Sequence, residues 1–237
     1  MPSFEVCRTP SHAPDAQDAL SRAIRAVAVI PGTGEYALAT TSVSLDFGLG
    51  KVAWGNRNSP SGLTDFETSL TALSQELPNC DAASLVVSWF GDDLRCGHCS
   101  IKPKVEQNQA DAKKMRWRAG GISRTQAETV PLRDRSVVYG GTPSDASVVE
   151  AIKAMRDRGQ KVMFYPFILM DQLAGNRKTD PYSGAADQPA LPWLGRITLD
   201  RAPGQTNSVD GTDWPHSKCH SFLAPRKCPI FQRSLIG

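Results

Sequence analysis

The alternation of apolar and polar positions is most regular over residues 136–171, where it predicts a strand, a helix and a second strand. A β-branched run at Val137–Val138 stops at Gly140, and helical spacing begins shortly afterwards. Either Ser144 or Asp145 can cap this helix, because a short side-chain oxygen accepts the free N–H groups of the first turn. Apolar side chains then recur at i, i+4 and i+7, on one helical face: Val148, Ile152 and Met155.

The end of this helix and the segment behind it complete the unit. Gly159 suits a helix end, since glycine adopts positive φ without strain. The nearly continuous apolar run that begins at Lys161 is typical of a strand buried on both faces. A strand-helix-strand unit of this length is a right-handed crossover between parallel strands. The pattern therefore predicts an α/β fold.

A second helix and strand precede this unit. Thr64-Asp65-Phe66-Glu67 is a capping-box sequence, and residues 84–90 are typical of a short buried strand. An apolar stripe with helical spacing follows the capping box: Phe66, Leu70, Leu73 and Leu77. We therefore expect an outer layer of helices near 64–77 and 145–158. Parallel strands are expected beneath them near residues 84–90, 136–140 and 161–165.

Weaker patterns flank these elements. Residues 15–29 have helical spacing, and short strand-like runs occupy residues 36–40 and 43–47. Gly, Asn, Ser and Pro are frequent in residues 48–62, which predicts a loop. Residues 196–199 offer one further strand. The pattern thus places the regular part of the fold in the middle of the chain.

Composition and charge indicate an ordinary globular protein. The chain has 237 residues, of which 40% are hydrophobic and 22% charged. Its net charge of +3, with both signs interspersed, gives no argument for nucleic acid as a partner. The longest apolar run, residues 162–170, is far shorter than the ~20 residues of a membrane span. No signal-peptide pattern opens the sequence, so we expect synthesis in the cytoplasm without export by the general secretory route.

Acidic residues follow the predicted strands, where α/β barrels place their active sites. Asp92 and Asp93 close one strand, and Asp171 closes another. A glycoside hydrolase needs two carboxyl groups about 5–9.5 Å apart, which makes Asp93 and Asp171 candidate catalytic residues. The alternative is structural: Asp92 and Asp93 would cap the following turn, and Asp171 would be a loop acid.

Aromatic residues in the same strands offer flat faces for sugar rings. Trp89, Tyr139 and Tyr165, together with Asp92, form the candidate substrate-binding set. The alternative is that these aromatic side chains fill the core.

Two cysteines have the spacing of half a zinc site. Cys96 and Cys99 stand in C-G-H-C, within residues 94–135, which we expect to be an elaborate connection. A complete site needs two further ligands, and the C-terminal segment contains three candidates: Cys219, His220 and Cys228. A local disulfide or two free thiols are the alternatives. Because a lone pair of cysteines is a weak signal and nucleotide and nucleophile motifs are missing, we expect no metal and no cofactor.

Long stretches of the sequence resemble one known family. Three of them match its TIM-barrel-like region: LVVSWFGDDLRCGHCSIKPKVEQ (85–107), VVYGGTPSDASVVEAI (137–152) and FYPFILMDQLAGN (164–176). Residues 21–40 and 58–67 resemble the part upstream, and residues 187–198 its continuation. The family is the large tail-tip protein of gene transfer agents, related to the baseplate or host-specificity proteins of siphophage-like tails.

The resemblance implies a division of the chain. Residues 1–62 would be an N-terminal α+β extension, and residues 63–211 a partial TIM-barrel-like (β/α) domain with long loops. Residues 212–237 resemble nothing in the family's continuation and look like an aberrant, truncated terminus. The barrel would then be incomplete.

The resemblance also implies a function. It suggests a structural component of a phage-like tail tip or baseplate, assembled into the virion tail and contributing to recognition of the host cell surface. The implied partners are other tail-tip proteins and cell-surface polysaccharide. A glycoside hydrolase acting on cell-wall or capsular polysaccharide is the enzymatic alternative, although the resemblance brings no matched catalytic pair. From the residues alone, a small-molecule-binding α/β domain of no viral origin also stays open.

Overall fold

The central element is a small parallel sheet. The structure, a computed structural model, describes residues 20–30, 34–192, 197–209 and 212. Strands β1 (Ala26–Val29), β4 (Ala82–Gly91) and β12 (Lys161–Met170) lie in the order β1-β4-β12, and both pairings are parallel. The short strand β5 (Ile101–Lys102) pairs antiparallel with the end of β4. The fold is therefore mixed α/β, and the described residues form no closed barrel.

Helix α2 (Asp65–Glu76) begins with the predicted capping box. Thr64 Oγ1 accepts a hydrogen bond from Glu67 N at 3.3 Å, and the Glu67 carboxylate accepts one from Thr64 N at 3.3 Å. Two N–H groups that the first turn leaves free are thereby satisfied. The sequence prediction of a helix over 64–77 is confirmed.

Helix α3 (Asp145–Asp157) begins at the first of its two predicted caps. Ser144 Oγ accepts a hydrogen bond from Ser147 N at 3.2 Å. Gly159 follows the helix with φ +79°, the left-handed conformation that ends a helix. The helix near 145–158 and the parallel strands near 84–90 and 161–165 are confirmed.

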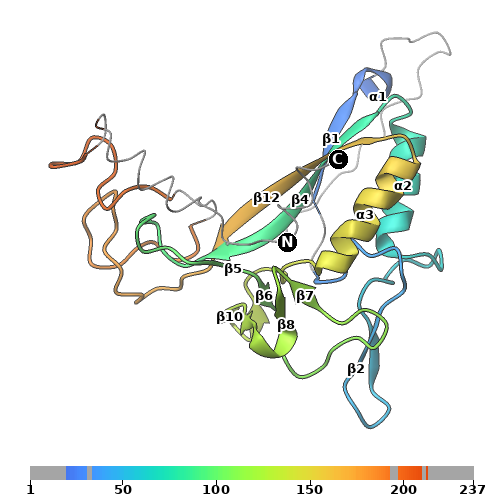
Figure 1. The fold of residues 1–237 in the computed structure, drawn as a ribbon, viewed down its shortest axis with the longest axis horizontal. Helices are drawn as coiled ribbons and strands as arrows, with labels where there is room; N and C mark the ends of the chain where they lie inside the picture. Colours follow the sequence, from blue (N-terminus) through green and yellow to red (C-terminus); the bar gives the residue numbers. More distant parts are fainter. Residues whose placement is uncertain (1–19, 31–33, 193–196, 210–211, 213–237) are drawn as a thin grey trace, which may run out of the picture.

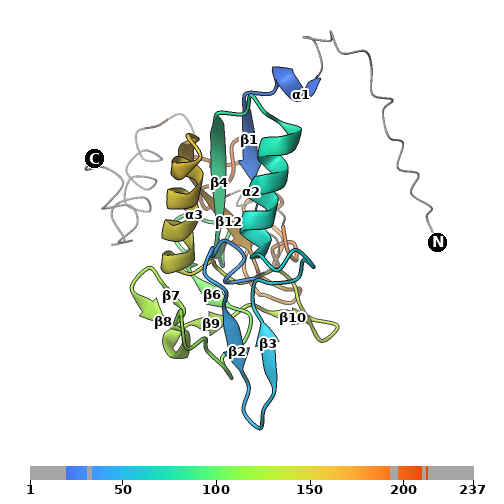
Figure 2. The same ribbon diagram turned by 90° about the vertical axis from the view of Figure 1, so that its right-hand side faces the viewer.

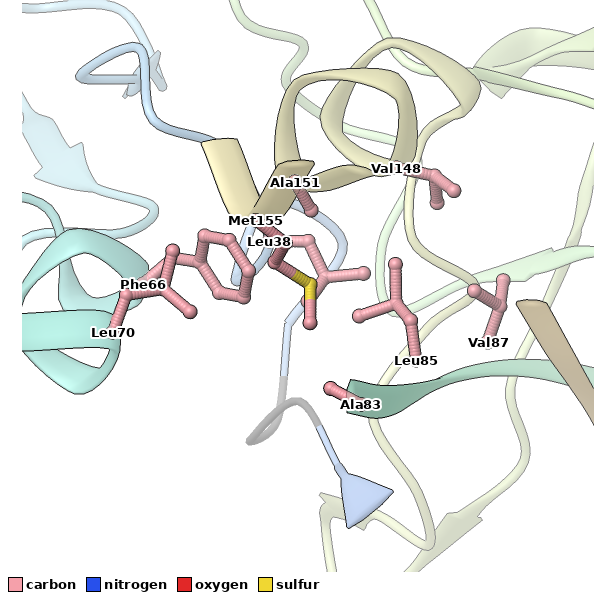
Figure 3. Close-up of a cluster of buried hydrophobic side chains, with 9 residues drawn as sticks. All are labelled: Leu38, Phe66, Leu70, Ala83, Leu85, Val87, Val148, Ala151 and Met155. Atoms are coloured by element: carbon pink, nitrogen blue, oxygen red, sulfur yellow. The ribbon is translucent and has the colours of Figure 1, made fainter. Parts of the chain in front are cut away.

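Both long helices cover the same face of the sheet (Figures 1 and 2). Figure 3 shows apolar side chains of α2, α3 and β4 meeting in one cluster. The buried members are Leu38, Phe66, Leu70, Ala83, Leu85, Val87, Val148, Ala151 and Met155. Because odd-numbered β4 side chains enter this cluster, even-numbered ones point to the opposite face. Removing Leu85 or Met155, both 0% exposed, would open a cavity and cost about 2–5 kcal/mol.

Short two-stranded ladders lie below the main sheet in both views (Figures 1 and 2). Strands β2 (Ser44–Asp46) and β3 (Val52–Trp54) form one antiparallel hairpin. Strands β7 (Arg118–Ala119) and β8 (Ile122–Ser123) form another, followed by the 3₁₀ helix η1 (Arg124–Gln126). Strands β6 (Lys104–Val105) and β9 (Glu128–Thr129) pair in parallel. A second cluster around the fully buried Trp117 holds the base of β2 and the strand β7 together.

The prediction of a parallel strand of the main sheet near residues 136–140 is wrong. Residues Ser136–Val137 form β11, which pairs antiparallel with β10 (Leu132–Arg133) outside the main sheet. The run of two adjacent β-branched residues before Gly140-Gly141 is too short to form a strand that pairs along the ten-residue strands of the main sheet. The strand that enters α3 from the main sheet is β4 instead, and residues 92–144 are inserted between them. The predicted strand-helix-strand crossover is present, but its first strand, β4, lies much further upstream in the sequence than predicted.

Three flanking predictions also need correction. In place of a helix over 15–29, the described part has a four-residue helix α1 (Leu20–Ala23) followed by strand β1. The sequence AVAV fits a strand as well as a helix, and pairing with β4 decides between them. Residues 36–40 form turns, not a strand. The expected loop over 48–62 contains β3, because its apolar residues pair with β2.

Some predictions fall on residues outside the described part. These are the start of the expected N-terminal helix, part of the strand over 196–199, and nearly all of the segment 212–237. Within 196–199, Thr198 forms an isolated parallel bridge with Arg95.

Candidate functional site

Charged side chains gather at the carboxyl ends of β4 and β12. Lys104 Nζ lies 2.7 Å from Asp171 Oδ2 and 3.2 Å from Glu128 Oε2. Lys104 and Glu128 come from the paired strands β6 and β9, while Asp171 directly follows β12. Lys102 pairs with the other oxygen of Glu128. The result is a row of alternating charges: Asp171, Lys104, Glu128 and Lys102.

Burial and the charge of the partner have opposite effects on the pKa values of Asp171 and Lys104. Burial is the largest influence on Asp171 and raises its pKa; the hydrogen bond and charge of Lys104 lower it, the charges of Asp92 and Glu128 raise it slightly, and the pKa stays raised overall. Burial would lower the pKa of Lys104, but its two carboxylate partners raise it overall. Lys102 is the largest cause that lowers the pKa of Glu128. Lys104 therefore stays a cation fixed between two carboxylates.

Asp93 follows the end of β4, but it forms no hydrogen bond or ion pair with any of the four residues in this row. Its side chain is 4% exposed and accepts three hydrogen bonds from Arg95 and one from Gln188. Burial alone would raise the pKa of Asp93, yet these donors together lower it to about 2. Gln188 also accepts a hydrogen bond from Leu94 N at 2.9 Å. Asp93 thus anchors residues 172–192 to the end of β4.

Asp92 behaves as a turn-capping residue. Its Oδ1 accepts a hydrogen bond from Ser100 N at 2.7 Å, and its side chain is 41% exposed. Lys178 Nζ lies 3.9 Å from Oδ2, the upper limit for an ion pair. The hydrogen bond from Ser100 N is the contact expected if Asp92 caps the turn after β4 and has a structural role.

The three aromatic candidates have different surroundings. Trp89 packs against the helix-covered core and against Gly120. Tyr139 packs on Phe90, with ring centroids 6.4 Å apart, on the other side of the sheet. Burial raises the pKa of the Tyr139 phenol, and the charge of Asp171 raises it further. Tyr165 is 45% exposed and lies beside Phe167 on β12.

The two cysteines of C-G-H-C are both buried, 7% exposed for Cys96 and 4% for Cys99. Burial raises the pKa of the Cys99 thiol, which disfavours the thiolate that zinc binds. Among the described residues, no group of three or more His, Cys, Asp or Glu side chains has the arrangement of a metal site. Cys219, His220 and Cys228 lie outside them.

A buried ion cluster was not found from the sequence. Arg124 of η1 donates to both carboxylate oxygens of Glu35, one at 3.1 Å, and also to the Tyr36 hydroxyl at 3.1 Å. Its Nε lies 3.1 Å from Asp111 Oδ1. Burial raises the pKa of Glu35 despite Arg124. Glu35 and Arg124 stand in unrelated stretches with no motif, so only the fold could reveal their contact.

Comparison with protein-family models gives no match to this chain, and comparison with curated proteins gives none. Within the part of the chain described, no helix is both long and apolar enough to cross a bilayer.

The arrangement at the strand ends favours fixed structure over proton transfer. Asp93 has every oxygen engaged by firm donors, and Asp171 faces a cation at 2.7 Å. A general acid must release its proton to a substrate, and a nucleophile must have a free oxygen. The raised pKa of Asp171 is the one property here that suits a catalytic acid.

Proposed function

We propose that this chain is a structural component of a phage-like tail tip, of the gene transfer agent type, that contributes to contact with the host cell surface. The support begins with the long runs that resemble this family, which cover residues of β4, α3 and β12 alike. The proposal includes a partial barrel as the fold of this region.

The chain order of the sheet is the observation that carries the proposal. The strands follow one another in space as they do in sequence, β1-β4-β12, with α2 and α3 in the two crossovers. Both helices lie on one face, as Figure 2 shows. A (β/α)-barrel repeats this step with all helices outside, whereas a doubly wound sheet reverses its strand order and covers both faces. The observed order therefore supports a segment of a barrel.

The ion pairs at the strand ends support a scaffold rather than an enzyme. Asp93 and Asp171 each hold together segments that are distant in sequence, through Gln188 and Lys104 respectively. Both oxygens of Asp93 accept hydrogen bonds, and Asp171 is paired with Lys104 through Oδ2. A barrel-derived module with its strand-end acids used in this way suits a protein whose task is to assemble and bind.

The experiment is to locate the protein in particles. Antibodies against the chain should label one end of the tails of particles released by cells that carry the gene. Cells lacking the gene should release particles with incomplete tails or with reduced adsorption to host cells. If gradient-purified particles contain none of the protein, the proposal is wrong.

A glycoside hydrolase is the second candidate, and one observation favours it. The two acids that follow adjacent strands have pKa values pushed in opposite directions, upward for Asp171 and to about 2 for Asp93. Such a division is typical of an acid and its ionised partner. Release of reducing sugar from host cell-wall or capsular polysaccharide, abolished by Asp171→Asn, would establish this alternative. If antibodies label the tails but the protein releases no reducing sugar, the structural function is supported and the hydrolase is not.

A further inference from the structure

The β2–β3 hairpin projects from the fold and carries an apolar tip. Figure 2 shows it extending away from the main sheet, beyond the other ladders. Residues 47–51 form its tip, held by hydrogen bonds from Phe47 N to Lys51 O and from Lys51 N to Gly48 O, each 2.9 Å. Leu49 sits there with φ +50° and a fully exposed side chain. A strained, exposed leucine at a loop tip contributes nothing to the stability of this fold.

The exposed apolar surface continues along one face of the hairpin. Val52 is 58% exposed and Trp54 53%, and the alternation of strand residues places them on the same face. Phe47 adds a further 37%-exposed ring at the tip. Leu45 points the other way, into the cluster around Trp117 that anchors the hairpin. The anchored base and the apolar outer face indicate a surface built for contact.

Two cations lie against this apolar surface, and more lie in the segment next to the hairpin. Lys51 Nζ lies 5.6 Å from the Phe47 ring centroid, and the Arg57 guanidinium lies 4.8 Å from that of Trp54. The neighbouring segment packs on the hairpin through a bridge between Leu45 and Ala112. That segment carries four exposed basic residues, a local concentration of positive charge that the net charge of the whole chain does not reveal: Lys113, Lys114, Arg116 and Arg118. The one acid of the hairpin, Asp46, lies opposite Val52 on this same face and pairs with Lys113 at 3.0 Å.

We propose that the β2–β3 hairpin is a membrane-contact element that inserts its tip into the surface of an anionic lipid bilayer. The proposal rests on the hairpin alone and does not depend on membership of a tail. The aliphatic side chain of Leu49 enters the acyl region, and Trp54 stays at the interface, where tryptophan is enriched. The cations pair with anionic headgroups, each adding to the attraction. A soluble polyanion would account for the cations but not for the exposed Leu49 and Val52.

The test measures binding of the full chain to lipid vesicles. Vesicles of phosphatidylcholine alone are compared with vesicles that also contain phosphatidylglycerol, at about 0.1 M and about 0.5 M salt. We expect binding to the anionic vesicles at least about tenfold tighter than to the neutral ones, and weakened by salt. Quenching of tryptophan fluorescence by brominated lipid should occur and should be largely lost in Trp54→Phe.

Two substitutions of the same kind separate the tip from the rest of the surface. Leu49→Asp removes the inserted side chain and adds a repelled charge, so affinity should fall about tenfold or more. Leu132→Asp makes the same change on the β10–β11 ladder, where Leu132 is 59% exposed, and should leave affinity within about twofold. Both positions are exposed, and circular dichroism checks that both variants fold.

Three outcomes would overturn the proposal. The first is absence of binding to either vesicle, which would leave the hairpin to a protein partner. The second is binding that Leu49→Asp and Leu132→Asp weaken equally. The third is anionic binding that survives Leu49→Asp and is displaced by soluble polyphosphate, which would indicate a polyanion site instead.

Discussion

Lys104 and Asp171 form an ion pair of 2.7 Å although their side chains are only 10% and 3% exposed. Lys104 comes from β6, in the long insertion between β4 and α3, whereas Asp171 ends β12 of the main sheet. The pair therefore fastens the insertion to the sheet. Charges taken out of water are costly, and only a close partner of opposite sign compensates for that cost.

Lys104→Met should destabilise the protein strongly. The substitution keeps the aliphatic stem but leaves the Asp171 carboxylate buried without its cation, which should cost about 3–5 kcal/mol in free energy of unfolding at pH 7. Urea unfolding measures the loss. Since the remaining carboxylate would have a pKa raised still further above its unfolded value, the loss should shrink as pH falls.

Lys102→Met is the matched control. Lys102 also pairs with Glu128, but both side chains are about half exposed, 47% and 52%. Exposed pairs contribute about 0–1 kcal/mol, so this variant should unfold almost as the parent does. Equal losses for the two lysines would show that burial does not set the strength of the Lys104 pair.

The pH dependence of stability should carry the opposite sign at Asp93. Its folded-state pKa of about 2 lies below the ordinary value, so its contribution is present above about pH 4 and is lost as pH falls toward 2. The full contribution is roughly 2 kcal/mol, and about half of it should be lost at pH 3. The quantity to measure is the difference in unfolding free energy between the parent and Asp93→Asn, from pH 6 down to 3. A difference that stays constant over that range would contradict the ionised Asp93–Arg95 contact.

Elements with a complete local pattern were predictable from the sequence. Helix α2 has its own capping box and stripe, helix α3 its own cap and terminal Gly159, and β4 and β12 are long apolar runs. Each of these signals lies within about fifteen residues. The strand near 136–140 had only two β-branched residues, and no local pattern says which strands pair.

The candidate site was predictable only in part for the same reason. Asp92, Asp93 and Asp171 do lie at strand ends, as the apolar runs before them indicate. Their partners are a different matter. A lysine such as Lys104, between Pro103 and Val105, carries no sign that it will be buried against an acid. Gln188, which engages Asp93, lies in a Gly- and Pro-rich stretch with no periodicity.

We expect no hydrolysis of peptidoglycan or of simple aryl glycosides by this chain. Asp93 is saturated by donors from Arg95 and Gln188, and Asp171 is held by Lys104. Release of reducing sugar, or of a chromogenic aryl group, measures the activity. Turnover by the parent chain that disappears in Asp171→Asn would show that the Lys104 pair opens when substrate binds.

The last prediction concerns two adjacent glycines in the turn between β7 and β8. Both have left-handed backbone, φ +57° at Gly120 and φ +85° at Gly121, so alanine is strained at either position by about 1–2 kcal/mol. They differ in surroundings: a Cβ on Gly120 would lie 2.5 Å from Trp89 Cη2, whereas one on Gly121 would meet nothing within 4 Å. Gly121→Ala therefore reports backbone strain alone. Gly120→Ala should cost about 1–3 kcal/mol more, because Trp89 must leave its position on the core. Replacing Trp89 with Phe should remove most of that extra cost, which a double-mutant cycle of unfolding free energies measures. If the two alanine variants are equally stable, the turn does not rest on Trp89, and β7 does not pack against the sheet through this contact.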